Sequence, residues 1–335
     1  MSNTARKARI EVVYQGVDIT ETVSASLKSF VLNDNVAYTA DDVSMELEDR
    51  ELKWLKSWWP ERSDYFTIKM KTENWMKAGS QTLDLGTFLL DEPSYSGPPH
   101  QITLSGISTP ADSNFSETAR DKAWEKSDIK AIAQEIAGRY NMKLLFDSQV
   151  NPIIERLDQN KVSDMQFLNT LCQKYGLALK VTSKAIIIFD FASYEAKQPV
   201  LTIDRAGGMV ESFSIQTATG YTACKVSSSS SDNKTISVVV QDPTKRGQKE
   251  KLLEVSEDVR NRTEAEYVAK ARLREENKKE AQISLTMVGN LNIAAGMTVG
   301  LSNFGKFDGT YLIEKARYQF SPFTMTLELY RVMGW

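Results

Sequence analysis

Apolar and polar residues alternate in a series of short stretches near both ends of the chain. A period of two puts successive side chains on opposite faces of a strand, so this pattern is typical of half-buried β-strands. The stretches that show it are Arg9–Tyr14, Val43–Glu48, Tyr65–Lys71, Pro199–Ile203, Val210–Thr217, Tyr221–Ser227, Thr235–Gln241, Ala281–Val288 and Met297–Leu301. Ile19–Leu32 is expected to add short strands, and the serine-rich stretch Ser227–Asn233 a solvated loop. The pattern predicts one β-rich region at the start of the chain and a second at its end.

The alternation is interrupted at Asp49–Trp59. Leucines and a tryptophan recur there at spacings of three and four, which predicts a short helix that Pro60 ends. Trp54 and Trp58 are four residues apart and would share another face of that helix. One or two of the tryptophans in this stretch should belong to the core. Because Trp buries a large area at low entropy cost, we predict Trp54 and Trp58 as candidate anchors at a subunit contact.

Between residues 111 and 197 the apolar period changes to three or four, which is typical of helices. Ser127–Tyr140 and Ser163–Tyr175 each begin with a serine placed as an N-cap, and Gly176 follows at the position that favours glycine. The predicted buried residues are Ile129, Ile132, Ala133, Ile136, Tyr140, Phe167, Leu168, Leu171, Cys172 and Tyr175. The strands predicted beside these helices are Asn141–Phe146, Leu177–Val181 and Ala185–Phe189. Helices and strands in alternation predict a small α/β module.

A further helix is predicted at Thr263–Glu280, where Thr263 and Glu266 have the spacing of a capping box. Opposite charges three or four residues apart support this helix. Its thin apolar face is marked by Tyr267, Ala271 and Arg274. The helix would either face solvent or offer a docking face to a charged neighbour, and Arg274 is the candidate contact on it.

Two stretches of the chain have closely similar sequences. Gly86–Gly106 reads GTFLLDEPSYSGPPHQITLSG, and Gly309–Leu329 reads GTYLIEKARYQFSPFTMTLEL. They share Gly, Thr, Leu, Tyr, Pro, Thr and Leu at the same offsets without a gap. Each reads as a hairpin, with a polar turn that contains proline between two strands. The repeat predicts an α+β, β-rich fold in which one β-domain is used twice, over residues 1–110 and 198–335, with the α/β module 111–197 between the copies.

The bulk composition narrows the class of protein. A chain of 335 residues should form two or three domains, and its net charge of −3 provides no basic surface for nucleic acid. No apolar run reaches the length of about 20 residues that a membrane span needs, and the first residues do not form a signal peptide. We therefore expect the protein to assemble in a cytoplasm, without a membrane anchor. The two cysteines are too few for a disulfide framework, and Cys172 is expected to be a small buried residue.

The sequence contains little that could support catalysis. His100, the single histidine, lies in the predicted turn of the first hairpin. No HExxH, paired CxxC, GxxxxGK[ST] or GxGxxG motif is present, so we expect no metal site, no cofactor and no catalytic residue. The acidic candidates for a glycosidase pair are Asp41, Asp42, Glu46, Glu48, Asp91 and Glu92. Their predicted outward positions favour a solvated face, since acid catalysis needs a partly desolvated site.

The stretch Lys161–Asp190 resembles the middle segment of the phage late control D family, the baseplate hub proteins of contractile-tailed phages. Six residues carry the resemblance, namely Ser163, Asp164, Phe167, Leu168, Tyr175 and Gly176. A second part of the resemblance is C-terminal, in Gly296, Asp308–Tyr311 and the pair Thr326 and Leu327. The resemblance covers most of the chain in order and length.

The resemblance implies a particular architecture and role. Such hubs have two related β-barrel-like tube domains per chain and form homotrimers, so that three chains present six similar domains. This ring would join a hexameric tail tube protein to a trimeric spike protein, in the virion tail baseplate of a phage or tail-like particle assembled in the host bacterial cytoplasm. The tape-measure protein and the baseplate wedge are further candidate partners. No sequence-specific contact with nucleic acid and no enzymatic activity are implied.

Two alternatives remain open at this point. The chain could be a cell-wall hydrolase carried on the tail tip, or a binding module whose α/β part holds a glycan or another protein. Trp335 is a further candidate interface residue, because a tryptophan at the end of a chain is either disordered or packed against a neighbour.

Overall fold

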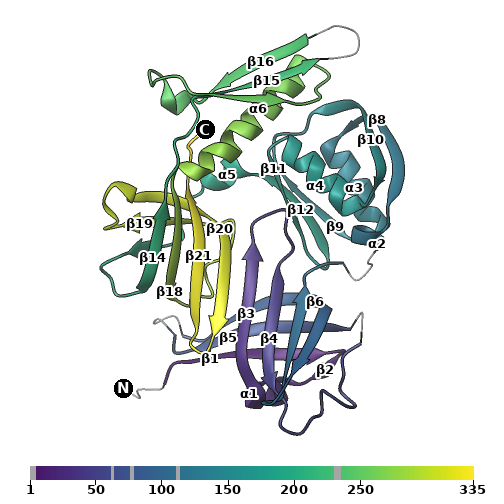
Figure 1. Cartoon of the computed structure of the whole chain (residues 1–335), viewed down its shortest axis with the longest axis vertical. Coiled ribbons are helices and arrows are strands. Elements are labelled where there is room, and N and C mark those ends of the chain that lie inside the picture. Colours follow the sequence, from purple (N-terminus) through teal and green to yellow (C-terminus); the bar gives the residue numbers. More distant parts are fainter. Residues whose placement is uncertain (1–4, 62–63, 76–78, 111–113, 230–234) are drawn as a thin grey trace.

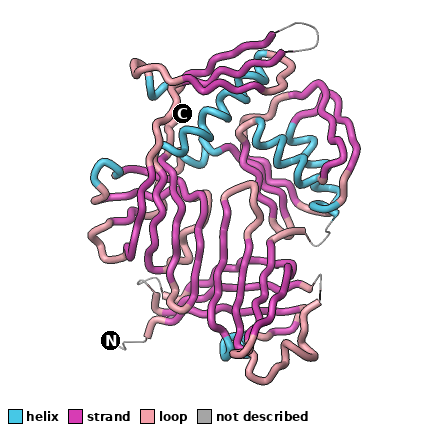
Figure 2. Tube along the Cα trace, in the orientation of Figure 1, coloured by secondary structure: helices cyan, strands magenta, loops and turns pink. Residues whose placement is uncertain are grey.

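The computed structural model describes residues 5–61, 64–75, 79–110, 114–229 and 235–335. A sheet of 13 strands runs through the lower and middle parts of the molecule in Figure 1, and two smaller parts of mixed structure lie above it. Figure 2 shows that most of the helices gather in these two upper parts. The chain is therefore β-rich, with most of its helices segregated from the main sheet, as the sequence predicts.

The first β region occupies the lower part of Figure 1. Its elements are β1 (Lys7–Tyr14), β2 (Val17–Asp18), α1 (Thr20–Ser26), β3 (Leu27–Asn35), β4 (Asp42–Glu48), β5 (Tyr65–Glu73), β6 (Gln81–Ser96) and β7 (Gln101–Ile107). β4 and β5 bury alternate residues, which is the pattern that predicts them. The expectation of short strands throughout Ile19–Leu32 is wrong in its first half, where the chain forms α1.

The helix predicted at Asp49–Trp59 is also wrong, because this segment forms turns. The Asp49 carboxylate accepts hydrogen bonds from the backbone N–H groups of Lys53 at 2.8 Å and Trp54 at 3.1 Å. Leu52 has a φ of +57°, which a right-handed helix does not allow. The Asp49 side chain thus closes a local turn that competes with the helix.

The second β region consists of β13 (Thr202–Asp204), β14 (Val210–Gln216), β18 (Gln282–Val288), β19 (Thr298–Ser302), β20 (Gly309–Phe320) and β21 (Thr324–Arg331), with a short 3₁₀ turn η3 (Gly305–Phe307). Its strands have the same order in the sheet as those of the first region. The first order is β3-β4-β7-β6-β5-β1, and the second is β14-β18-β21-β20-β19-β13. The last pairing differs, since β1 is antiparallel to β5 and β13 is parallel to β19. We call these two sets of strands the first unit and the second unit.

The repeated hairpins, β6–β7 and β20–β21, also have the same register. Counted from the first glycine of each hairpin, the same positions are paired across both hairpins. Corresponding pairs are Leu89–Ile107 and Leu312–Tyr330, Leu90–Gly106 and Ile313–Leu329, and Tyr95–Ile102 and Tyr318–Met325. Each ladder contains a bulge, between Asp91 and Ser94 in the first and between Ile313 and Lys315 in the second. Because bulges are specific features of a strand pair, their shared place supports a true repeat.

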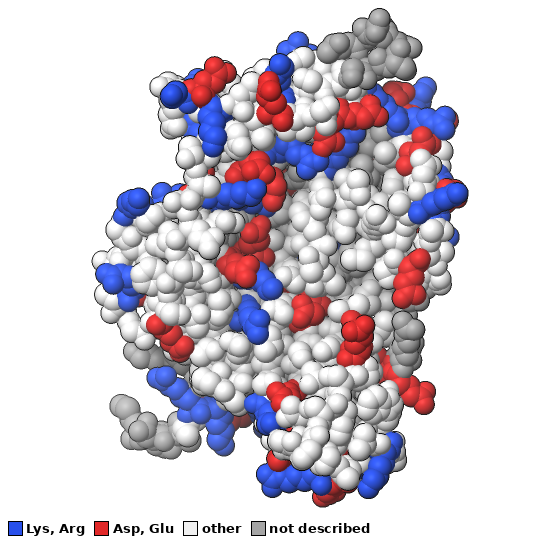
Figure 3. Space-filling view, in the orientation of Figure 1, with Lys and Arg blue, Asp and Glu red and all other residues white. Residues whose placement is uncertain are grey.

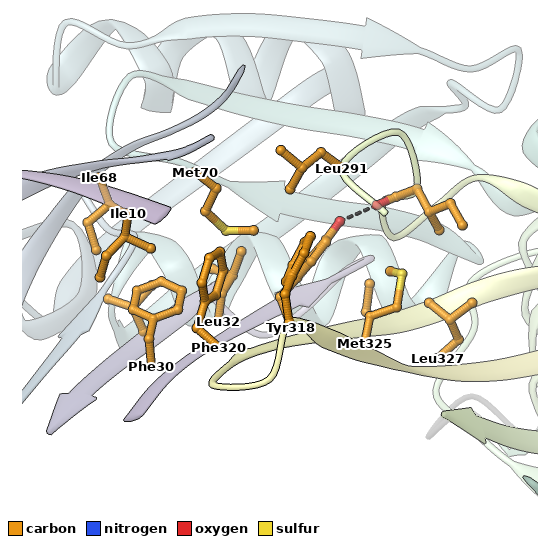
Figure 4. Packing of buried hydrophobic residues seen from close by; sticks show 14 of the residues in the cluster. Ile10, Phe30, Leu32, Ile68, Met70, Leu291, Tyr318, Phe320, Met325 and Leu327 are labelled. Carbon is orange, nitrogen blue, oxygen red and sulfur yellow. Dashed lines mark hydrogen bonds between the residues drawn. The ribbon is translucent and has the colours of Figure 1, made fainter. Parts of the chain in front are cut away.

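One hydrophobic core lies beneath both units. Strands of both units contribute buried residues to it, among them β1, β3 and β5 of the first unit and β20 and β21 of the second (Figure 4). They include Ile10, Phe30, Leu32, Ile68, Met70, Tyr318, Phe320, Met325 and Leu327. The Tyr318 hydroxyl donates to the backbone oxygen of Ile293, which satisfies the polar group of this buried ring.

The α/β module comprises α2 (Asn114–Glu117), β8 (Arg120–Asp128), α3 (Ile129–Arg139), β9 (Lys143–Asp147), β10 (Ile153–Val162), α4 (Asp164–Lys174), β11 (Leu177–Val181), β12 (Ala185–Asp190) and α5 (Phe191–Glu195). Ser163 caps α4 as predicted, and the residues predicted to be buried in this helix are buried. The cap of α3 is Asp128 rather than Ser127, because the Asp128 carboxylate accepts from the N–H of Ala131. The ladder between β8 and β10 has no counterpart in the predictions.

The uppermost part is inserted between β14 and β18 of the second unit. It consists of β15 (Ala223–Ser229), β16 (Thr235–Gln241), η1 (Pro243–Lys245), β17 (Leu252–Ser256), α6 (Arg262–Asn277) and η2 (Lys278–Glu280). β15 and β16 form a separate sheet with β17, on which α6 packs. The cap of α6 is Asn261 rather than Thr263, and Val268 and Leu273 form its buried face. The predicted serine-rich loop lies largely at residues 230–234, outside the described residues.

Candidate assembly interface

The two units are joined edge to edge by β3 and β20. These strands are antiparallel, with Phe30 opposite Phe320 and Leu32 opposite Tyr318. The Phe30 and Phe320 rings meet edge to face with centroids 5.5 Å apart. Figure 4 shows these side chains pointing into the shared core. Burial of a large apolar side chain of this kind contributes about 2 kcal/mol, so the junction is a stable part of the fold.

The other face of the joined sheet is polar. Directly paired residues share a face, and one row of them crosses both units. This row is Ser212, Thr286, Thr326, Arg317, Asn33 and Asp42. The hydroxyls of Thr286 and Thr326 lie 3.0 Å apart, and Asn33 Nδ2 donates to Asp42 Oδ1 at 2.7 Å. This row of polar side chains therefore crosses six strands, from β14 of the second unit to β4 of the first.

Charges on this polar face are of both signs, as in Arg317 and Asp42 of the row and in Lys315, which faces Glu328. Lys28 Nζ lies 3.6 Å from Glu46 Oε1, so this carboxylate, one of the acidic candidates, is paired across two strands. Figure 3 shows a largely uncharged surface over the middle of the molecule, with isolated blue and red side chains. The described residues of this face form no basic stripe that would hold a phosphate backbone.

The part of the sheet that runs from β14 to β6 has a free backbone edge at each end. In the ladders that the described residues form, β14 pairs with β18 alone, and the segment of β6 from Ser94 to Ser96 pairs with β7 alone. Phe213, in the middle of β14, is 44% exposed. An exposed edge strand with an exposed aromatic side chain is a template for another strand. The alternation in Val210–Thr217 predicts the strand, but it does not show that the strand lies at an edge.

A partly buried ion cluster fixes the α/β module to the first unit. Lys180 Nζ lies 2.5 Å from Asp34 Oδ1 and 3.0 Å from Asp41 Oδ2. Tyr38 adds a hydrogen bond from its hydroxyl to the backbone oxygen of Leu177 at 2.6 Å. Burial raises the pKa of Asp41 to about 6, although Lys180 opposes the shift. The prediction that Asp41 lies on a solvated face is therefore wrong, and its role is structural.

The two predicted tryptophan anchors differ in exposure. Trp54 is 4% exposed and belongs to the core, so its prediction as an interface residue is wrong. Its ring meets that of Trp58 edge to face at 5.5 Å, and Trp58 is 40% exposed. The Asp49 turn thus buries one indole and leaves the other at the surface. Of the two, Trp58 can still contact another chain.

Arg274 and Trp335 both make contacts within the chain. Arg274 is buried, and its Nη2 donates to Glu195 Oε1 at 2.7 Å, so the prediction that it forms an outward docking contact is wrong. Glu195 also accepts from the Tyr330 hydroxyl at 3.0 Å and from the N–H of Met333 at 2.9 Å. Trp335 packs on the core beneath α6, with the Arg274 guanidinium 5.3 Å from its ring centroid. This cluster ties the last residues to α5 and α6.

The remaining candidates for chemistry are dispersed. His100 lies in the turn of the first hairpin, with its ring 6.1 Å from that of Tyr95. Cys172 is buried, as predicted, and burial raises the pKa of its thiol to about 12. The described part of the chain holds no cluster of three or more His, Cys, Asp or Glu side chains that could bind a metal ion. None of its helices is long and apolar enough to span a membrane.

Two related β units that share one sheet, with an α/β module between them, define the architecture of this chain. The family model of the phage tail baseplate hub (GPD) matches residues 107–322, and the chain therefore belongs to this family. The predicted resemblance is thereby confirmed, and the family places the chain in the baseplate of a phage tail or tail-like particle.

Individual relatives agree with this assignment. The chain is 27% identical over 210 residues to the probable baseplate hub protein of Escherichia phage 186, in an alignment that covers 61% of this chain and 52% of that protein. The chain thus spans about half the length of the curated relatives it matches.

Two solved structures share its fold over nearly the whole of both chains. The tail protein from Neisseria meningitidis MC58 has a TM-score of 0.72 at 13% identity, with 98% of each chain covered. The 43 kDa tail protein of prophage MuSo2 from Shewanella oneidensis has a TM-score of 0.71 at 12% identity, with 97% of this chain and 99% of that chain covered.

Proposed function

We propose that this chain is a structural hub that forms a homotrimer and adapts a sixfold tail tube to a threefold spike. The observation that carries the proposal is the duplication of the β unit, with the same strand order and the same hairpin register. A trimer of such chains presents six similar units on a ring, which a tube of six identical subunits can match. The same trimer keeps a true threefold axis for the spike.

The polar face of the sheet is suited to line the channel of such a ring. Its hydroxyl and amide side chains are well hydrated and carry little net charge. A passing DNA or tape-measure protein would therefore meet neither a phosphate-binding surface nor an apolar surface on which to adhere. The proposed localisation is the centre of the baseplate, between tube and spike, with the baseplate wedge as a further neighbour.

The proposed role is assembly rather than catalysis. The family supports a structural function. Among the acids considered for catalysis, Glu46 is paired with Lys28 and Asp41 with Lys180. Each is used in a contact that holds strands or modules together, and no observation on the described residues favours the hydrolase or the glycan-binding alternative.

The test is the stoichiometry of a reconstituted complex. The chain would be purified with its tube and spike proteins, and the mass of the complex measured by native mass spectrometry. The expected result is three copies of this chain with six tube subunits and three spike subunits. A complex with one, two or six copies of this chain would overturn the proposal.

A further inference from the structure

We infer that neighbouring copies of this chain join by pairing β14 of one copy with the C-terminal part of β6 in the next. The two strands would be antiparallel, and their register would be set by the junction that already exists inside each chain. This inference rests on the proposed ring and specifies the strands that close it.

Each unit has two edges that can take part in such a junction. Inside the chain, β3 of the first unit pairs with β20 of the second. The strand that corresponds to β3 in the second unit is β14, and the strand that corresponds to β20 in the first unit is β6. In the described ladders these are the two edges left without a partner. A head-to-tail contact of this kind closes a ring of three when each copy repeats it with a rotation of one third of a turn.

The equivalence of β14 and β3 extends to individual residues. β3 pairs with β4 through a bulge between Leu27 and Ser29, and β14 pairs with β18 through a bulge between Val210 and Ser212. Counting from these bulges, Phe213 corresponds to Phe30. The hairpin register likewise makes Tyr95 of β6 the counterpart of Tyr318.

The internal register then predicts the contacts between chains. Because Leu32 faces Tyr318 and Val31 faces Gln319 inside the chain, the corresponding residues should face each other between chains. The predicted pairs are Ile215 with Tyr95, Ser214 with Ser96, and Phe213 with Gly97. Pro93, which has no N–H to donate, lies at the bulge of β6 and outside these pairs.

Burial and composition agree with this docking. Phe30 is 0% exposed and Tyr318 is 1% exposed at the internal junction, whereas Phe213 is 44% exposed and Tyr95 is half-buried. A second copy seated on β14 would cover Phe213 as β20 covers Phe30. The sequence of β14, VESFSIQ, contains no lysine or proline of the kind that blocks edge pairing.

Paired cysteines test the register directly. The variant Ser214→Cys/Ser96→Cys places one cysteine on each predicted partner, and directly opposite residues of an antiparallel pair lie within disulfide range. The two native cysteines are buried and should not interfere. Oxidised in the complex with tube and spike proteins, this variant should run as a covalent trimer without reductant. The matched control Ser212→Cys/Ser96→Cys is displaced by two residues and should remain monomeric on the same gel.

The outcomes separate this inference from the proposed function. If the complex contains three copies but the Ser214–Ser96 pair does not cross-link, the junction is wrong and the trimer stands. If the Ser214→Cys single variant forms a dimer through its own cysteine, β14 pairs with itself and the junction is overturned. If no three-copy complex forms, both proposals fail.

A folding control accompanies the cross-linking test. If the reduced double variant unfolds at the same temperature as the wild type, the substitutions leave the fold intact. A Phe213→Asp variant provides an independent test of the same edge.

Discussion

Phe30 and Phe213 occupy corresponding positions in the two units, yet Phe30 is fully buried and Phe213 is 44% exposed. The difference arises because β20 covers β3, whereas no strand of the same chain pairs with the outer edge of β14 in the described structure. Phe30 therefore stabilises the fold, whereas the exposed Phe213 can contact another chain.

The two phenylalanines should respond differently to substitution. Phe30→Ala leaves a cavity in the core and should lower the free energy of unfolding by about 3–5 kcal/mol. Phe213→Asp should change the stability of the isolated chain by less than about 1 kcal/mol, since it alters a surface position. It should nevertheless prevent the three-copy ring in native mass spectrometry.

A matched control for Phe213→Asp is Val239→Asp. Val239 is 52% exposed on β16, in the separate upper sheet, and is not part of the predicted junction. This variant should assemble like the wild type. If both variants lost the ring equally, a charge at any exposed apolar position would disrupt assembly. That result would contradict a specific role for β14.

The ion cluster of Lys180, Asp34 and Asp41 should make stability depend on pH. The pKa of Asp41 in the folded chain is about 6, above its usual value of 3.8, so the folded state binds a proton in the range between them that the unfolded state does not. Folding is therefore favoured as the pH falls from 7 toward 4. The wild type should gain stability relative to Asp41→Asn between pH 7 and pH 5, by about 1–2 kcal/mol in urea unfolding.

Removing Lys180 from this cluster should destabilise the folded chain at neutral pH. Lys180→Met leaves two partly buried carboxylates without a counter-ion and should cost about 3–5 kcal/mol at pH 8. The cost should shrink at pH 5, where Asp41 can be protonated. A loss that is the same at both pH values would contradict an electrostatic role for Lys180.

The buried pair of Arg274 and Glu195 should stabilise the contact between α6 and α5. Arg274→Met leaves Glu195 with hydrogen-bond donors but no counter-charge, and should lower the free energy of unfolding by about 3–5 kcal/mol. Arg262→Met on the same helix breaks an exposed pair with Glu266 and should have no measurable effect. Chemical unfolding of both variants provides the comparison, and equal effects would rule out a special role for burial.

Trp58 remains a predicted contact for another protein. Trp58→Ser should leave stability nearly unchanged, whereas Trp54→Ala should cost about 3–5 kcal/mol because it empties a core position. In a pull-down with the separately purified tube and spike proteins, Trp58→Ser should weaken the capture of one of them. Unchanged capture of both would exclude Trp58 as an anchor.

The sequence predicts the parts of this fold whose signals are local. The alternation in Val43–Glu48, the cap and stripe of Ser163–Tyr175 and the repeated hairpins all appear in the structure because short-range periodicity determines which face is buried. The Asp49 turn differs from prediction because local hydrogen bonds and the positive φ of Leu52 compete with the apolar period. The division of the chain at residues 110 and 197 stays a prediction.

The candidate site could be predicted only in part. The repeat in the sequence indicates two related units, but the junction of β3 with β20 joins strands from opposite ends of the chain, and no local pattern encodes it. The burial of Arg274 follows from another long-range contact, its pair with Glu195. The signal in the sequence for the edge at β14 is the similarity of LKSFVL in β3 to VESFSI in β14.

The most direct test is a cryo-electron microscopy reconstruction of the hub bound to its tube and spike, calculated without imposed symmetry. The account predicts three copies of this chain whose six β units lie at equal angles around one axis. Successive units would be joined alternately by β3–β20 inside a chain and β14–β6 between chains, with the polar face toward the channel. A ring of six chains, or units related by no common axis, would contradict it.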